Sequence, residues 1–125
     1  MKYSVNAKGC PDAVGAASKG TTAGRFVFVS GQVPVDESGA LMGRGNIRAQ
    51  ASRILDQVEA VLSEVGLDLS DVAKTTVYLA DLALLDAFDE VYSERIDPPM
   101  PARSVVQVSR LPLGADAQMD AVACR

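Results

Sequence analysis

The sequence contains no histidine and no tryptophan, and it has only two cysteines. Without histidine, the chain lacks the side chain that most often acts as a general base near neutral pH and most often binds a metal. Cys10 and Cys124 lie near opposite ends of the chain, so no cysteine pair has the spacing of a zinc site. One disulfide between them is conceivable, but we expect both to be reduced. These absences argue against a metal enzyme.

Long apolar runs and basic clusters are also missing. No segment approaches the ~20 apolar residues that a membrane helix needs, and Met1–Ala7 lacks the apolar block of a signal peptide. The formal net charge is −4, and no lysine or arginine cluster offers a basic face for a phosphate backbone. We therefore expect a cytoplasmic protein with neither a membrane nor a nucleic acid as partner.

The residues that are present predict one domain, residues 1–125, because this length fits a single domain and 48% of the chain is apolar. Apolar periodicity and turn residues separate strands from helices. The pattern predicts strands at Arg25–Val29, Asp71–Ala80, Arg103–Val108 and Ala117–Cys124, and helices from Asn46 to Gly66 and from Leu82 to about Arg95, with Asn46 and Asp81 as caps. This order predicts an α+β fold in which two helices cover one face of a sheet. Each predicted helix carries an apolar stripe at three- and four-residue steps: Ile47, Ala51, Ile54, Leu55, Val58, Leu62 and Val65 in the first, and Leu82, Leu85, Phe88, Val91 and Tyr92 in the second.

Several predicted strands are apolar on both faces. Phe26 and Phe28 alternate with Val27 and Val29 in one strand. In another, Val77 and Leu79 alternate with Tyr78 and Ala80. A soluble monomer does not tolerate a large bare apolar face. We therefore expect a second copy of the chain to cover the face that the helices leave open.

One short stretch, Pro101–Val108, places an arginine among apolar residues. Proline cannot donate to a strand ladder, so Pro101 predicts the start of a strand, and Arg103 follows directly. An inward guanidinium needs an anionic partner, and its planar fork suits a carboxylate. The alternative is an arginine at a strand end that reaches into solvent.

Several segments together resemble the RidA family, also called the YjgF family, of imine and enamine deaminases. The matching segments are Val29–Pro34, Ala49–Ala51, Asp71–Leu82, Val91–Tyr92, Pro101–Ser104 and Arg110–Pro112. They occur in the family's order and span nearly the whole chain.

The resemblance implies a chorismate-mutase-like α+β fold with a mixed sheet. It also implies a homotrimer with a central barrel, with helices outside and pockets at the subunit interfaces. The implied reaction is hydrolysis of a small 2-imino or 2-enamino acid to the 2-oxo acid and ammonia, without metal or cofactor. In this family the arginine at the position of Arg103 holds the substrate carboxylate. Ser30 and Gly31 are further candidates for substrate binding, although Ser30 equally fits a simple turn residue.

The chain departs from the family pattern at four positions. Ala17 replaces a tyrosine, Asp89 an asparagine, Val105 a frequent cysteine, and Gln118 a glutamate that would orient or activate water. The amide of Gln118 can hold a water by hydrogen bonds but cannot take a proton at neutral pH. The substitutions predict a roomier, more apolar pocket around the carboxylate anchor.

Three carboxylates are alternatives for the missing glutamate. Asp116 and Asp120 share strand parity with Gln118, and Asp89 is another possible base. The simpler interpretations are a solvated strand edge for the first two and a helix surface charge for Asp89.

Two functions therefore compete. The first is a RidA-like deaminase acting on a small unsaturated carboxylate. The second is a trimeric protein that binds carboxylate metabolites with little or no catalysis. A ribonuclease, a function also attached to the family by name, fits poorly with an acidic chain that has no histidine.

Overall fold

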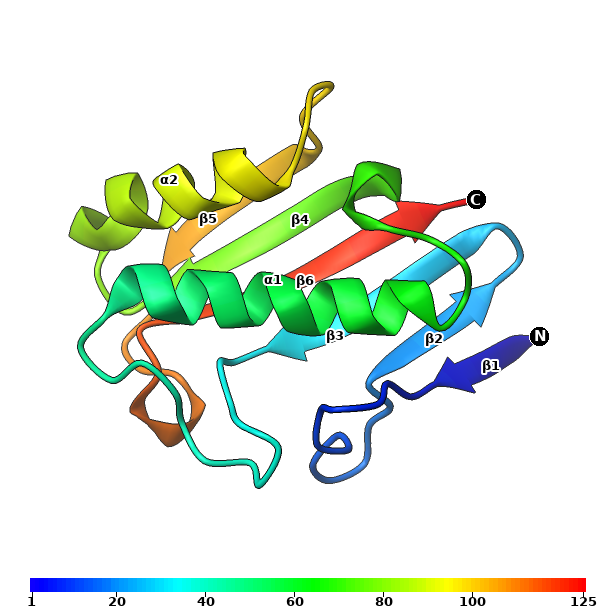
Figure 1. The fold of residues 1–125 in the computed structure, drawn as a ribbon, viewed down its shortest axis with the longest axis horizontal. Coiled ribbons are helices and arrows are strands. Elements are labelled where there is room, and N and C mark those ends of the chain that lie inside the picture. The colour runs from blue at the N-terminus through cyan, green and yellow to red at the C-terminus, as the bar shows by residue number, and fades with distance from the viewer.

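The computed structural model describes all 125 residues and forms two layers, a six-stranded sheet with two helices on one face (Figure 1). The strands are β1 (Lys2–Val5), β2 (Gly20–Ala23), β3 (Phe26–Gln32), β4 (Val72–Leu79), β5 (Ala102–Gln107) and β6 (Ala117–Cys124). The helices are α1 (Ile47–Ser63) and α2 (Leu85–Arg95), with single 3₁₀ turns at Leu69–Asp71, Leu82–Leu84 and Pro112–Gly114.

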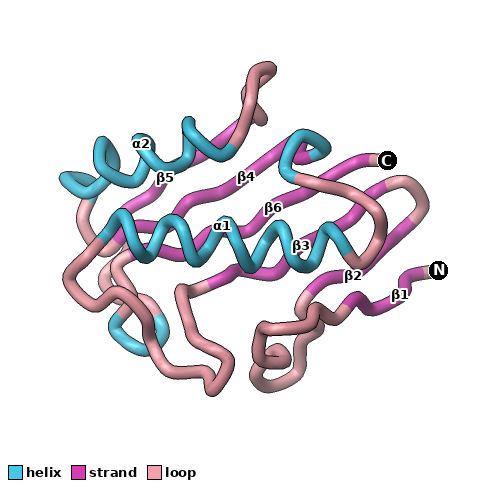
Figure 2. Tube along the Cα trace, in the orientation of Figure 1, coloured by secondary structure: helices cyan, strands magenta, loops and turns pink.

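The strand order in the sheet is β1-β2-β3-β6-β4-β5. The last strand, β6, lies between β3 and β4 and is antiparallel to both, whereas β4 and β5 are parallel. The sheet is therefore mixed, as the resemblance implied. Figure 2 shows α1 lying across the middle strands and α2 over the β4–β5 edge.

Helix α1 confirms the prediction from periodicity. The side chain of Asn46 accepts a hydrogen bond from the amide of Ala49 at 3.1 Å and so caps the helix. Gly66, with φ of +76°, follows the helix in a conformation that favours glycine. Six apolar residues of the predicted stripe are buried against the sheet: Ile47, Ala51, Ile54, Leu55, Val58 and Leu62.

The second helix begins one turn later than predicted. Asp81 caps as expected, by accepting from the amide of Ala83 at 2.9 Å. The first turn, Leu82–Leu84, is 3₁₀, and Leu82 is exposed rather than part of the buried stripe. A tighter first turn is common where a helix starts. Phe88 and Tyr92 are the residues that α2 buries.

The face of the sheet away from the helices carries uncovered aromatic residues. Val27 and Val29 are buried beneath the helices, whereas Phe26 and Phe28 point the other way and are 50% and 42% exposed. Val106 and Tyr78 are neighbours on β5 and β4 of this same face. The apolar alternation expected from the sequence is thus present on both faces.

Candidate functional site

The candidate site residues separate into two groups within one chain. Ala17, Ser30, Gly31 and Gln118 surround one cavity, and Asp89 and Arg103 line another. Val105 lines neither cavity, because it lies opposite Val77 on β4 and packs against the core. The expectation that Val105 forms a wall of a pocket between subunits stays a prediction.

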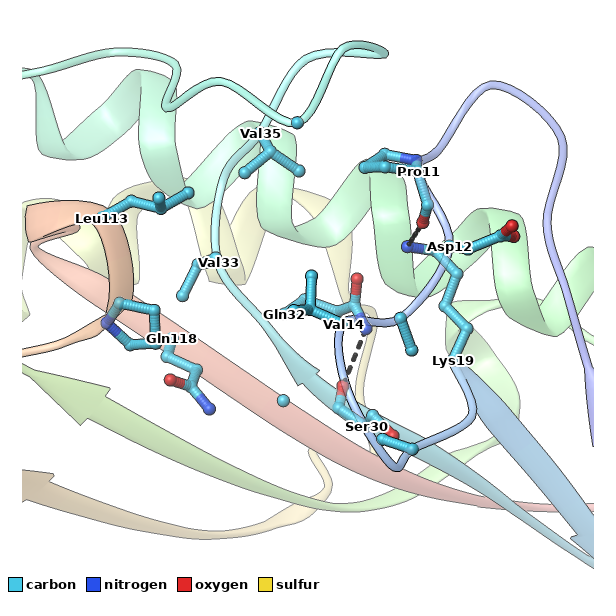
Figure 3. Close-up of a pocket in the computed structure, with 15 residues that line it drawn as sticks. Pro11, Asp12, Val14, Lys19, Ser30, Gln32, Val33, Val35, Leu113 and Gln118 are labelled. Carbon is cyan, nitrogen blue, oxygen red and sulfur yellow. Dashed lines mark hydrogen bonds between the residues drawn. The ribbon is translucent and has the colours of Figure 1, made fainter.

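The first cavity has a volume of about 490 Å³ and lies where β3 ends and β6 begins. The loop before β2 closes one side, and Pro112 and Leu113 close the other (Figure 3). Val33 and Val35 make part of the wall apolar. A small organic acid fits a cavity of this size and polarity.

Ser30 supports the loop that borders this cavity. Its hydroxyl donates to the carbonyl of Ser18 at 2.6 Å, and its amide donates to the carbonyl of Lys19 at 2.9 Å. The hydroxyl proton is thus used within the chain. The oxygen of Ser30 can still accept a hydrogen bond from a ligand.

Gly31 and Gln118 lie in close contact across β3 and β6. A Cβ atom placed on Gly31 would lie 2.1 Å from Nε2 of Gln118, well inside van der Waals contact. Glycine is therefore required here to leave the Gln118 carboxamide in its position. In Figure 3 the Gln118 side chain extends from β6 at one side of the cavity, and Asp12 and Lys19 lie at the other.

We expect Gly31→Ala to move the Gln118 carboxamide and to weaken ligand binding or turnover, with the free energy of unfolding changed by less than about 1 kcal/mol. The cost stays small because the clashing atoms are the end of a flexible side chain. The measurement is a double-mutant cycle with Gln118→Ala, using calorimetric binding and urea unfolding. An effect of Gly31→Ala that persists undiminished when residue 118 is alanine would contradict this contact.

Lys19 lines the same cavity and was not singled out from the sequence. It is 5% exposed, and its Nζ donates to the carbonyl of Pro11 at 2.7 Å. Burial lowers the pKa of the Lys19 ammonium from its ordinary value. Lys19 is the only cationic residue lining this cavity, and Asp12 is the only anionic one. No motif marks Lys19, because it stands in a loop of small residues.

The second group is organised by an ion pair. Nη1 and Nη2 of Arg103 donate to the two carboxylate oxygens of Asp89, at 2.5 Å and 3.0 Å. The hydrogen bonds to Asp89 raise the pKa of Arg103 above its ordinary value. The side chains of Arg103 and Asp89 are 24% and 36% exposed, so the pair is partly buried.

The anionic partner of Arg103 within the single chain is Asp89 rather than a ligand, so the role of Arg103 as an anchor for a substrate carboxylate stays a prediction. Asp89 is therefore neither the isolated surface charge nor the uncommitted base that its sequence position suggested.

Tyr92 holds the guanidinium from another side. The guanidinium carbon of Arg103 lies 4.8 Å from the centre of the Tyr92 ring, a cation–π distance. The Tyr92 hydroxyl is 2.8 Å from Oγ1 of Thr75, and burial raises the pKa of Tyr92. Arg103, Asp89 and Tyr92 line an open cavity of about 340 Å³, together with Ser93, Met100 and Pro101.

Arg103 and Gln118 lie on opposite faces of the sheet. Arg103 is opposite the buried Thr75 on the helix-covered face, whereas Gln118 is opposite Tyr78 on the open face. One chain therefore does not bring the two residues to one ligand.

The two remaining carboxylates have partners elsewhere. Asp120 accepts a hydrogen bond from the Tyr78 hydroxyl at 3.0 Å, which raises the pKa of that tyrosine. The Asp116 carboxylate accepts a hydrogen bond from Nε2 of Gln50 at 3.4 Å, and Oε1 of Gln50 accepts one from the Asp116 backbone amide at 2.9 Å. Neither carboxylate lines the Gln118 cavity. No group of three or more metal-binding side chains occurs in the chain, and no helix is long and apolar enough to cross a membrane.

The fold and these cavities define a class of small α+β proteins with a mixed six-stranded sheet and two helices on one face. Residues 8–125 match the family described as Endoribonuclease L-PSP, and the chain belongs to this family, also known as the RidA, YjgF or RutC family.

Curated relatives and solved structures agree with this assignment. The chain is 41% identical over 113 residues to a RutC family protein of Pyrococcus abyssi, covering 90% of this chain and 89% of the relative. It is 34% identical to the 2-iminobutanoate/2-iminopropanoate deaminase of Salmonella typhimurium, covering 100% and 99%. The crystal structure of E. coli TdcF with bound serine superposes with a TM-score of 0.89 at 33% identity, covering 98% of each chain.

Proposed function

We propose that the protein hydrolyses a small 2-imino or 2-enamino acid to the corresponding 2-oxo acid and ammonia. The observation that carries this proposal is the cavity in which Ser30, Gly31 and Gln118 meet, at the end of β3 and the start of β6. The similarity to a 2-iminobutanoate/2-iminopropanoate deaminase supports it. A relative whose structure contains bound serine supports a small carboxylate as the ligand.

The proposed active unit is a homotrimer in which the open faces of the sheets form a central barrel. Arg103 and Gln118 lie on opposite faces of one sheet, so a site that uses both needs residues from two copies. The exposed Phe26 and Phe28 supply apolar surface for such an assembly.

Each residue has a limited role in the proposed reaction. Arg103 of one copy holds the substrate carboxylate, and the Gln118 amide of another positions a water at the imine carbon. The water adds to the protonated C=N bond, and one of its protons passes through solvent from the added oxygen to the nitrogen. The C–N bond of the tetrahedral adduct then breaks, ammonia leaves and takes up the remaining hydroxyl proton as ammonium, and the 2-oxo acid remains. The imine is already electrophilic when protonated, so positioning supplies most of the rate enhancement.

The deciding experiment generates 2-iminobutanoate enzymatically and follows release of 2-oxobutanoate and ammonia. We expect a rate above the spontaneous hydrolysis that increases linearly with protein concentration. A rate equal to the background at all concentrations would exclude the deaminase.

A specific observation favours a second candidate, a metabolite-binding protein. Gln118 offers no proton acceptor at neutral pH, and Ala17 stands where the family resemblance calls for a tyrosine, so two groups that would support catalysis are missing. Saturable binding of a 2-oxo or 2-amino acid without turnover would select this function over the deaminase. A ligand at 100 times its Kd raises the stability of the folded state by about 2.7 kcal/mol, which a thermal melt detects.

We expect Phe28→Asp to convert the proposed trimer into a folded monomer. The side chain is 42% exposed on the open face, so the substitution costs the single chain little, whereas a buried carboxylate at an interface is strongly unfavourable. Light scattering gives the mass, and far-ultraviolet circular dichroism confirms folding. Glu64→Gln, on an exposed residue after α1, serves as the control. A wild-type mass equal to one chain at micromolar concentration would refute the assembly.

A further inference from the structure

The Arg103 cavity contains a complete ion pair rather than a free cation. Asp89 lies on α2 and Arg103 on β5, and their charges cancel within hydrogen-bond distance. The other side chains around this cavity, from Tyr92, Ser93, Met100 and Pro101, carry no charge at neutral pH. The part of the cavity that one chain supplies is therefore neutral, with a positive and a negative charge side by side.

Arg103 retains hydrogen-bond donors after pairing with Asp89. A guanidinium has five N–H groups, and Asp89 takes one from each Nη. Three N–H groups remain, the Nε–H and one on each Nη; the Nε–H and the nearer of these two Nη–H groups point along a second edge of the same plane, which matches a second carboxylate. The Tyr92 ring, at 4.8 Å, lies against the guanidinium and limits its rotation.

Asp89 likewise retains acceptor capacity. A carboxylate offers about four lone-pair positions, and Arg103 uses one on each oxygen. The Asp89 side chain is 36% exposed, so a ligand in the cavity can reach the remaining positions. An N–H group that carries positive charge is the best donor to such an oxygen.

We propose that Asp89 is a specificity-determining residue that makes the Arg103 cavity select zwitterions, with the ligand carboxylate on the free edge of Arg103 and a cationic nitrogen on Asp89. A simple carboxylate would leave two anions around one cation in a partly buried cavity, which is unfavourable. A 2-amino acid or a protonated 2-imino acid adds no net charge and pairs both ends. The 2-oxo acid lacks the cationic nitrogen, so the cavity discriminates against it.

This proposal refines the proposed function, because it assigns to Asp89 the recognition of the iminium group and predicts weak binding of the 2-oxo acid product. Selection of zwitterions does not require catalysis. If the protein selects zwitterions but shows no turnover, the zwitterion proposal stands and the deaminase function is excluded. If the protein shows turnover without such selection, the deaminase function stands and the zwitterion proposal is excluded.

The test is calorimetric titration of the wild-type protein with 2-aminobutanoate and with 2-oxobutanoate, at one pH and salt concentration. We expect 2-aminobutanoate to bind at least tenfold more tightly. Asp89→Asn keeps the shape and removes the charge, and we expect it to reverse the order by weakening 2-aminobutanoate and strengthening 2-oxobutanoate. Glu90→Gln is the matched control, because Glu90 is the next residue of α2 and pairs with the surface residue Arg48; its selectivity should equal that of wild type.

Three results would overturn the proposal. The first is that the wild-type protein binds 2-oxobutanoate as tightly as 2-aminobutanoate or more tightly, and the second is that neither ligand binds. The third is that Asp89→Asn raises the affinity for both ligands equally, which would mean that Asp89 only competes with the ligand carboxylate for Arg103. The wild-type comparison needs no variant, so it decides the matter even if Asp89→Asn fails to fold. Circular dichroism of each variant checks folding.

Discussion

Replacing Gln118 with glutamate is expected to raise the rate of 2-iminobutanoate hydrolysis by about 10²–10⁴-fold, the usual contribution of a general acid–base group. The two side chains have the same shape, so the carboxylate should occupy the position of the present amide beside Gly31. The relevant measurement is initial 2-oxobutanoate release as a function of pH, and the gain should disappear as the new carboxylate becomes protonated in acid.

The matched control is Gln107→Glu, which adds the same charge to β5 outside both cavities. Oε1 of Gln107 accepts a hydrogen bond from the Leu82 amide at 2.9 Å, and a glutamate oxygen preserves it. We expect no gain from this control. Equal rates for wild type and Gln118→Glu would mean that residue 118 does not face the reacting carbon.

Replacing Arg103 with methionine is expected to lower kcat/KM by about 10²–10³-fold, since removing one partner of a partly buried charge pair costs about 3–4 kcal/mol of ligand recognition. Methionine keeps much of the aliphatic length and the contact with Tyr92. The unfolding free energy should change by only about 1 kcal/mol, because Asp89 is partly exposed and can be hydrated.

Kinetics and urea unfolding, measured on the same preparations, separate recognition from stability. Arg48→Met is the control, because Arg48 forms an exposed ion pair with Glu90 at 2.8 Å. Its expected change in both quantities is small. Retention of wild-type kcat/KM in Arg103→Met would remove Arg103 from the site.

The sequence predicts the helices and central strands well because their patterns are strong. The stripe of α1 recurs at three- and four-residue steps, and Asn46 and Gly66 mark its ends, so both its extent and its buried face follow. The final strand, Ala117–Cys124, has the bounds expected. Strand β1 could not be predicted, because three of its four residues are exposed and show no alternation.

The candidate site is less predictable, because it depends on how strands pair. Alternation within one strand shows which residues share a face, but it does not show whether that face is the one covered by the helices or the open one. The parallel register of β4 and β5 turns Arg103 toward α2, and the antiparallel register of β4 and β6 turns Gln118 the other way. Lys19 is another case, since its burial depends on a loop that is tied to Pro11 and to Ser30.

Because Arg103 and Gln118 lie on opposite sides of the sheet, two inactive variants of the chain should restore activity when they assemble together. Two defective polypeptides, one with Arg103→Met and one with Gly31→Leu, should complement each other when refolded together, because each supplies what the other has lost. With random mixing in a closed ring, about a quarter of the junctions would regain both wild-type contributions. Activity recovered only after co-refolding, and absent when the finished preparations are simply combined, would identify the catalytic unit as a shared property of neighbouring chains.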